Sequence, residues 1–333
     1  MAYTDIIDRT DASPLIPEEV SREIIKTVAD SNALFQLARR LPDMSRKQNR
    51  MPVASALATA YFVNGATGLK QTTELAWKNK YIEAEELAVV VPIPNAVLDD
   101  SDYDIWGEVK PALVEAFNVA IVQAVLYGTN IPASWTTNLG AAGLVALCNA
   151  TGRVADVGDF ADLYEAIMGE SAEGAADGLL MQLETQGFNY TGHIAHITMK
   201  GRLRNTRDAN GQPLFNENRS GGPAAAGNAV GELAGAPLYF PNDGSIDPDE
   251  ALMITGDWRQ LVYAIRQDIS YTIATEGVIT NAAGEIVYNL FQQDMCALRA
   301  VMRLGFALPN PIRRMAQNDA TRCPFAILVE TGS

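Results

Sequence analysis

Hydrophobic residues recur at helical spacing over one long stretch, residues 102–128. The stripe runs through Ile105, Val109, Leu113, Ala116, Ala120, Ala124 and Gly128, widened by Phe117, Ile121 and Val125. Spacings of three and four residues put side chains on one face of an α-helix. Pro111 lies inside the pattern, so we expect a kink, or a short helix followed by a longer one. A helix of this length would span roughly 40 Å and could serve as a scaffold for other elements.

The N-terminal region predicts an extended arm followed by two helices. Residues 1–16 show little periodic pattern, which is typical of an arm without regular structure. Pro17 suits the first position of an amphipathic helix that continues to about Asp30. Ser31 can cap a second short helix, which Pro42 would end.

Two strand-like segments, 50–63 and 76–93, flank a polar connection that contains Gly65 and Gly68. A long hairpin with its tip within 64–75 is the simplest interpretation. A two-stranded hairpin is only marginally stable in water unless it lies on another surface. We therefore expect this hairpin to lie on its own body or on a neighbouring copy, which favours an assembling protein over a self-contained enzyme.

From about residue 159 onward, shorter helical and strand patterns are mixed, as expected for an α+β fold. The expected helices span 160–168, 175–186 and 200–205. The expected strands span about 194–199, 236–240, 251–256, 261–266, 270–275, 286–287, 297–308 and 324–330. Small and polar residues dominate 129–158 and 216–232, and we interpret both segments mainly as loops.

Composition narrows the classes of function. The 333 residues carry a net charge of −15, which argues against nucleic-acid binding by the bulk of the surface. An acidic protein can nevertheless enclose DNA that it does not grip. We find no uninterrupted apolar run of about 18 residues and no N-terminal signal pattern, so neither a membrane span nor secretion is expected. The three cysteines are widely spaced, and we expect them to be reduced and structural.

The candidate chemistry does not add up to an active site. His193 and His196 could share a metal on a helix, but the surrounding alternation indicates a strand, on which they would point to opposite faces. An acidic run, Asp99, Asp100, Asp102 and Asp104, could bind calcium but is more typical of helix capping and solvated charge. Nucleotide-binding loops, a hydrolase elbow and paired-cysteine motifs are lacking. We therefore predict no catalytic residue, no cofactor and no metal site.

Four segments, in this order along the chain, carry a resemblance to a known family. They are VPIPNAVLDDSDYDIWGEVKPALVEAFNVAIVQAVLYGT (Val91–Thr129), KGRLRNTRDANGQPLF (Lys200–Phe215), ALMITGDWRQLVYAIRQDISYTI (Ala251–Ile273) and NLFQQDMCALRAVMRLGFALPNP (Asn289–Pro311). With them, the chain resembles tailed-phage major capsid proteins of the Hong Kong 97-like fold. No single segment is a strict signature, and the resemblance depends on all four in the family's order.

The resemblance implies a division into the parts of that fold. Residues 1–45 would form an N-terminal arm, and 46–100 the E-loop hairpin with its flanking strands. A peripheral domain around the long spine helix would comprise 101–150 and 285–315. An axial domain would comprise 151–284 and 316–333.

The resemblance also implies function and partners. The chain would be a virion protein, assembled in the host cytoplasm through pentamers and hexamers into an icosahedral head around double-stranded DNA. Scaffolding and portal proteins would be partners, with decoration proteins as a further candidate, and no membrane would be involved. The alternative within the fold is an encapsulin-like shell that encloses cargo enzymes, and a monomeric enzyme with an unrecognised site is a second rival.

Two features of some family members stay open for this chain. Some members join an E-loop lysine covalently to an asparagine of a neighbour, and Lys70 lies near the predicted tip. The sequence places neither a partner asparagine nor an assisting acidic group, so crosslinking is not our main expectation. Some members also lose an N-terminal scaffolding segment. The short arm here fits either a processed form or a separate scaffolding protein.

Overall fold

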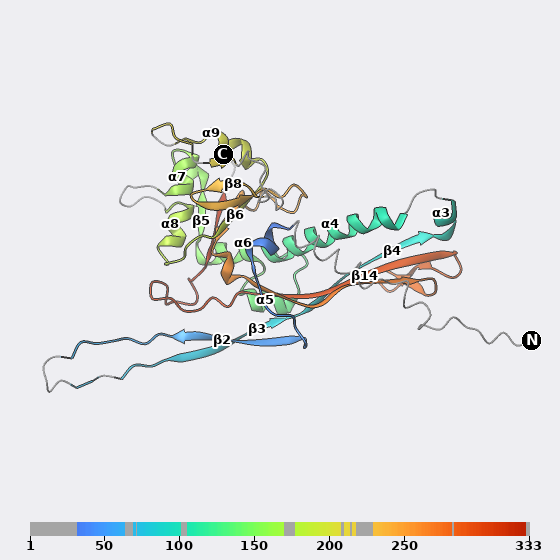
Figure 1. Ribbon diagram of the computed structural model, residues 1–333, viewed down its shortest axis with the longest axis horizontal. Helices are drawn as coiled ribbons and strands as arrows, with labels where there is room; N and C mark the ends of the chain where they lie inside the picture. Colours follow the sequence, from blue (N-terminus) through green and yellow to red (C-terminus); the bar gives the residue numbers. More distant parts are fainter. Residues whose placement is uncertain are drawn as a thin grey trace, which may run out of the picture. The chain divides into compact units, whose positions relative to one another are not determined.

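The computed structural model describes most of the chain and shows a mixed α+β fold (Figure 1). The described residues are 32–63, 69–70, 72–100, 105–169, 177–207, 210–213, 215–217, 229–281 and 283–330. The predicted arm at 1–16, the helix expected up to about residue 30 and part of the hairpin tip, 64–68, lie outside them.

The chain packs as two compact units. The described part of the smaller unit combines 86–100 and 105–114 with Gln267–Arg303, and the larger unit holds the rest. Within the described residues, each boundary between the units falls inside a continuous helix or strand. The chain therefore passes from one unit to the other through regular secondary structure.

A seven-stranded sheet forms the core of the larger unit. Its strands, in spatial order, are β5 (Val154–Asp156), β15 (Phe325–Val329), β10 (Met253–Gly256), β6 (Gly192–Ala195), β9 (Ala236–Tyr239), β8 (Ala229–Leu233) and β7 (Phe215–Glu217). Every residue of β6 and β10 is buried, which is typical of strands covered on both faces. The apolar side chains of this sheet and its helices form one continuous core, which includes Leu183, Phe188, Met199 and Leu328.

Short helices surround this sheet. They are α6 (Leu144–Thr151), α7 (Leu163–Met168), α8 (Leu179–Glu184) and α9 (Met199–Asn205). The Asp162 side chain caps α7 by accepting from the backbone N–H of Glu165 at 2.9 Å. In α8, Leu179, Leu180 and Leu183 are buried, so the helix contributes an apolar face to the core.

A four-stranded sheet has the order β1 (Arg39–Arg40), β11 (Val262–Ala274), β14 (Met295–Ala307) and β4 (Glu85–Pro94). Gly305 of β14 lies so close to the end of β3 that an added Cβ would be 2.4 Å from the Glu83 carbonyl oxygen. Only glycine allows this approach. Aromatic rings pack beside it, with Phe306 edge-on to Trp135 at 5.3 Å between ring centroids.

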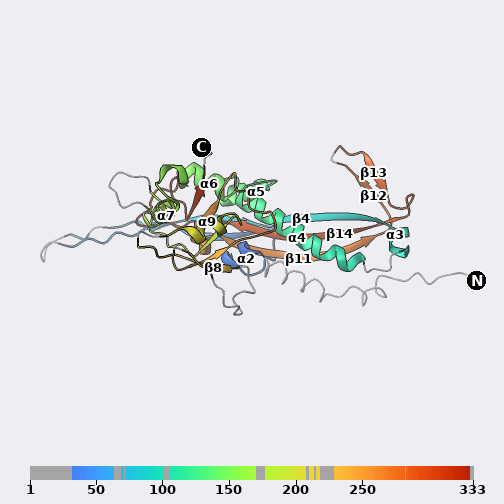
Figure 2. The ribbon, with the colours of Figure 1, turned by 90° about the horizontal axis from the view of Figure 1, so that it is seen from above.

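Two separate two-stranded ribbons complete the strands. In the larger unit, β2 (Gln48–Ala56) pairs antiparallel with β3 (Ala76–Glu83). In the smaller unit, β12 (Val278–Thr280) pairs antiparallel with β13 (Ile286–Asn289). Figure 2 shows both ribbons from a second direction.

The long helix is confirmed as α4 (Ile105–Leu126), which contains Pro111. It follows the short helix α3 (Asn95–Asp100). Gly128, with φ at 74°, lies just past the end of α4, where the left-handed conformation favours glycine. The buried face differs from the predicted stripe. Ala116 is exposed, whereas Val114, Asn118 and Val122 are buried beside Leu113, Phe117, Ile121 and Val125.

Residues Val109–Leu126 of α4 are long and apolar enough to cross a membrane by length and composition alone. Half of this window is buried against other parts of the protein. The buried core helix of a soluble protein passes the same test, so the helix is weak support for a membrane span. Lys110 and Glu115 interrupt its apolar run.

Several element predictions need correction. The strand predicted over 76–93 is two strands, β3 and β4, because the chain changes partners at Ala84, whose N–H donates to the Lys47 carbonyl at 2.8 Å. The two strands expected at 261–266 and 270–275 are one strand, β11. The segment 129–158, predicted as loops, contains α6 and another helix, α5 (Ala133–Leu139).

Smaller corrections concern helix and strand ends. The second N-terminal helix is α2 (Ala33–Leu37), and its cap is Asn32, whose side chain accepts from the Leu34 N–H at 2.9 Å. The sequence had favoured Ser31. The predicted loop 216–232 begins within β7 and ends within β8. Strand β12 was not predicted.

Candidate assembly surface

The β2–β3 hairpin and its extensions expose large apolar side chains. Trp77 is 67% exposed, Leu69 90%, and Phe62 fully exposed. The other exposed large apolar residues of this segment are Tyr61, Val63, Leu75 and Tyr81. Aromatic side chains of this size bury about 150–250 Å² each when they are covered, so a hairpin that exposes several of them is typical of a binding surface.

The strand register gathers exposed residues on one face of the hairpin. Arg50 lies opposite Tyr81, and Ala54 opposite Trp77. Residues directly opposite in an antiparallel pair share a face. Along β3, Trp77 and Tyr81 are exposed, while the alternate positions are partly covered. This face is therefore open and partly apolar.

The base of the hairpin is anchored in the larger unit. Ile82 is completely buried and packs in a small core with Met44, Ala84 and Val262. The Trp135 indole N–H of α5 donates to the Glu83 carbonyl at 3.1 Å, and Figure 1 shows α5 beside β3. The hairpin thus has one fixed end and one end that the described part of the chain leaves uncovered.

The second ribbon, β12–β13, is also apolar and exposed. Ile286 is 64% exposed, and the nearby Phe291 is 78% exposed. Val278, Val287 and Tyr288 are exposed as well. The sequence did not predict this surface. Its available signal was the apolar run Ile286–Tyr288, of which residues 286–287 were expected only to open a strand.

The two histidines do not form a metal site. His193, completely buried in β6, has Thr255 Oγ1 at 2.9 Å from Nδ1 and the Leu233 carbonyl oxygen at 3.1 Å from Nε2. Burial lowers the pKa of His193 to about 4. His196 lies just after the strand, with its Nδ1 at 2.8 Å from Thr198 Oγ1. Within the described part of the chain, no group of three metal-ligating side chains converges.

The other candidate residues are placed only in part. Asp102 and Asp104 lie outside the described residues, and the side chains of Asp99 and Asp100 are likewise not described. Lys70 is exposed near the hairpin tip. All three cysteines are buried and free, and the Cys148 and Cys323 sulfur atoms are 4.0 Å apart.

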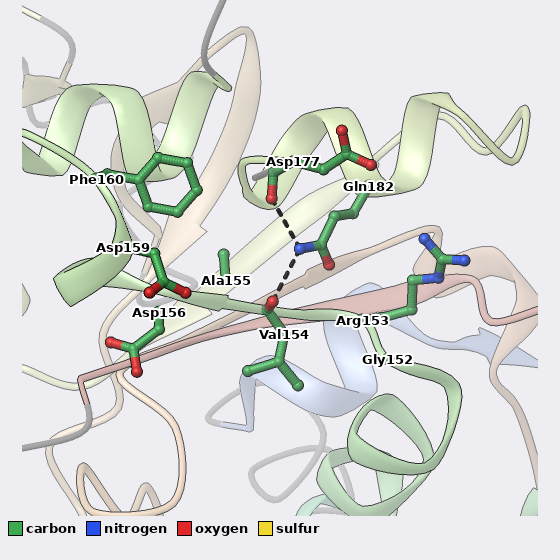
Figure 3. Close-up of a pocket in the computed structure, with 9 residues that line it drawn as sticks. All are labelled: Gly152, Arg153, Val154, Ala155, Asp156, Asp159, Phe160, Asp177 and Gln182. Carbon is green, nitrogen blue, oxygen red and sulfur yellow. Dashed lines mark hydrogen bonds between the residues drawn. The ribbon is translucent and has the colours of Figure 1, made fainter. Parts of the chain in front are cut away.

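A polar cavity of about 220 Å³ lies beside the edge strand β5 (Figure 3). The Gln182 amide nitrogen donates to the carbonyls of Val154, at 2.9 Å, and Asp177, at 2.8 Å. Since both acceptors fix the amide orientation, Gln182 Oε1 points elsewhere and has no partner among the described residues, as is also true of Arg153 Nε. A water molecule can donate to the first atom and accept from the second. The lining contains no histidine, cysteine or serine that could act as a nucleophile.

The sequence is similar to those of phage capsid proteins. Residues 12–313 match the phage capsid family. The major capsid protein of Staphylococcus phage 80alpha is 26% identical over 296 residues, which cover 88% of this chain and 81% of that protein.

Solved structures share the fold over almost the whole chain. A chain from Microbacterium phage Oxtober96 is 29% identical, with a TM-score of 0.71 and coverage of 98% of this chain and 100% of that one. A chain from Mycobacterium phage Cain is 22% identical, with a TM-score of 0.70 and coverage of 99% and 100%.

These relatives are phage proteins, which favours the phage head over the cargo-enclosing compartment. The expected α+β architecture of the Hong Kong 97-like fold and the expected location in the virion are confirmed. The family match spans far more than half of the sequence. The chain therefore belongs to the phage capsid family and is a structural protein of the virion shell.

Proposed function

We propose that this protein closes an icosahedral head by forming pentamers and hexamers whose hairpins overlap neighbouring copies. The observation that carries the proposal is the exposed apolar surface of the β2–β3 hairpin and its extensions, with Trp77 and Phe62 exposed in the single chain. Covering apolar surface stabilises association by about 25 cal/mol per Å² before the costs of ordering are subtracted. A second copy can supply that cover.

The proposal assigns parts as the resemblance implied. The N-terminal arm is 1–45, and the E-loop region is 46–100. The peripheral domain comprises 101–150 and 285–315, and the axial domain comprises 151–284 and 316–333. The seven-stranded sheet supports the axial assignment because all of its strands fall within those ranges. Strand β11 pairs with β14, so it links the two proposed domains through one sheet.

The proposed role is structural and not enzymatic. The shell encloses double-stranded DNA without sequence-specific binding, and the net charge of −15 supports a wall that repels packaged DNA. Scaffolding and portal proteins are the proposed partners during assembly. Covalent crosslinking through Lys70 is not part of the proposal.

The test removes apolar surface from the hairpin. We expect Phe62→Ser with Trp77→Ser to leave the subunit folded, because both side chains are exposed, and to prevent closure of shells in electron micrographs. Met181→Ser is a matched control, since Met181 is an exposed apolar residue of α8, away from the hairpin. Normal shells from the double variant would contradict the proposal.

Deletion of 64–75 gives a stronger version of the same test. It should leave soluble subunits or isolated capsomers that do not close. A sharp monomer peak near the chain mass of 35.9 kDa from the unmodified protein, at concentrations where capsid proteins assemble, would instead favour a monomeric enzyme.

A further inference from the structure

The segment 310–322, which we name the Arg322 loop, is folded around one buried cation. Arg322 is 2% exposed, although its guanidinium group is fully charged at neutral pH. Its Nη2 donates to the Asn310 carbonyl at 2.9 Å, and its Nε donates to Asn310 Oδ1 at 3.2 Å. Asn310 in turn donates from Nδ2 to the Arg322 carbonyl at 2.8 Å. Reciprocal bonds between its two ends therefore close the loop.

Arg322 also determines where the carboxylate of Asp319 lies. Nη2 of Arg322 donates to Asp319 Oδ1, and the other carboxylate oxygen of Asp319 accepts from Lys78 Nζ of β3. Burial acts to raise the pKa of Asp319, but Lys78, Arg322 and Lys80 together lower it below its usual value. The carboxylate is thus charged and is shared between the loop and the hairpin.

Two more bonds join the Arg322 loop to the other hairpin strand. The Ile312 N–H donates to the Ala54 carbonyl of β2 at 3.3 Å. Arg314 Nη2 donates to the carbonyl of Ala58, just beyond the end of β2, at 2.6 Å. The loop therefore contacts both strands of the hairpin.

The opposite side of the Arg322 loop is bound to the core of the larger unit. Gln186 donates to the Thr321 carbonyl at 2.9 Å and accepts from the Cys323 N–H at 3.0 Å. Arg313 donates to the Gly187 carbonyl at 2.7 Å, and its guanidinium carbon lies 4.2 Å from the centre of the Phe188 ring. The loop thus connects the hairpin to the core of the larger unit. It contacts the hairpin farther towards the tip than Ile82, which anchors the base.

We propose that the Arg322 loop is a positioning element that sets the direction in which the β2–β3 hairpin leaves the subunit. Lys78 and Arg314 are the positioning residues, and buried Arg322 holds the loop in the shape that meets them. The inference rests on the proposed function of the hairpin as the part that overlaps a neighbour. A hairpin held at both strands presents Trp77 and Phe62 to the neighbour at one angle, which regular shells require.

The side-chain contacts that join loop and hairpin can be removed without disturbing the core, while the backbone bond between Ile312 and Ala54 stays. Lys78 is 36% exposed in its side chain and Asp319 53%, and Arg314 is exposed as well. Exposed ion pairs contribute little to folding stability. A variant at these positions therefore separates the direction of the hairpin from the stability of the subunit.

The experiment compares two double variants of the full chain. The test variant combines Lys78→Met and Arg314→Met, and the control variant combines Arg202→Met and Arg303→Met. The control pair removes two positive charges as well, from side chains that form exposed ion pairs with Glu330 and Glu86. We expect the test variant to keep its melting temperature and to lose closed, uniform shells in electron micrographs. Hydrogen exchange of its unassembled subunits should be faster in β2 and β3 and unchanged in β15. The control should form normal shells.

A conservative variant adds a readout that a merely structural role would not give. Lys78→Arg keeps a cation beside Asp319. The double variant that carries Lys78→Arg in place of Lys78→Met should therefore form closed shells again. Closed, uniform shells from the Lys78→Met and Arg314→Met variant would overturn the inference. If deletion of 64–75 also left shells intact, the proposed function would fail as well. If the deletion prevented closure but the Lys78→Met and Arg314→Met variant still formed closed shells, only the positioning role would be wrong.

Discussion

At the scale of single residues, the packing around His193 determines which of its two ring nitrogens carries the proton. The Leu233 carbonyl can only accept, so Nε2 of His193 carries the proton, and Nδ1 accepts from the Thr255 hydroxyl. A second proton on Nδ1 would break the bond from Thr255 and charge a buried ring. The sequence predicted a strand around His193, and β6 holds this residue, but only the three-dimensional packing shows that His193 is the histidine that is buried.

The lowered pKa of His193 predicts a specific dependence of stability on pH. The folded pKa is about 4, below the usual 6.5, so the unfolded chain binds the extra proton first. The free energy of unfolding should therefore fall as pH drops from about 6.5 towards 4, by up to ~1.4 kcal/mol per pH unit from this group.

His193→Gln keeps a donor and an acceptor at this position and does not titrate. Urea unfolding of unassembled subunits at several pH values should show a shallower loss of stability for this variant than for the unmodified protein. Identical slopes in the two proteins would show that His193 does not titrate as described.

At the scale of elements, the position of a helix or strand is easier to predict from the sequence than the face that it buries. The periodic pattern identified α4, but the packing buries Val114 and Asn118 and exposes Ala116. The apolar run over β3 and β4 looked like one strand because nothing in its composition shows that the chain changes partners at Ala84. Similarly, the sequence does not show that Arg322 is buried. Arg322 and Asn310 lie at opposite ends of the Arg322 loop and pair only when the loop folds back on itself.

A glycine pair tests the close approach of β14 to the hairpin base. Gly305→Ala should lower the free energy of unfolding by about 1–3 kcal/mol, because the new Cβ meets the Glu83 carbonyl and the backbones must separate. Gly201→Ala is the control. Gly201 lies in α9 with open space around it, so alanine should raise stability by about 0.5–1 kcal/mol. Chemical unfolding measures both, and a neutral Gly305→Ala would show that β14 is free to move away.

At the scale of the whole molecule, charge and exposed apolar surface act in opposite directions. The chain carries 40 acidic and 25 basic residues, so its copies repel one another at long range. The proposed contacts between the hairpin and a neighbouring copy are largely apolar and act only at short range. Long-range repulsion falls as salt shortens the Debye length from about 10 Å at 0.1 M to about 3 Å at 1 M.

We therefore predict that added sodium chloride increases the extent of shell assembly from purified subunits or capsomers. Light scattering follows the reaction, and electron microscopy confirms that the product is closed shells. Shells that dissociate as salt rises would show that exposed ion pairs, and not apolar contacts, hold the copies together.

On the proposed function, a single copy is incomplete because its hairpin is covered only by another copy. Cryo-electron microscopy of the shells formed by the expressed protein would show this cover. We expect closed icosahedral particles in which Trp77 and Phe62 of each hairpin are buried against a neighbouring subunit. Particles in which both side chains stay in solvent, or hairpins that fold back on their own subunit, would contradict it.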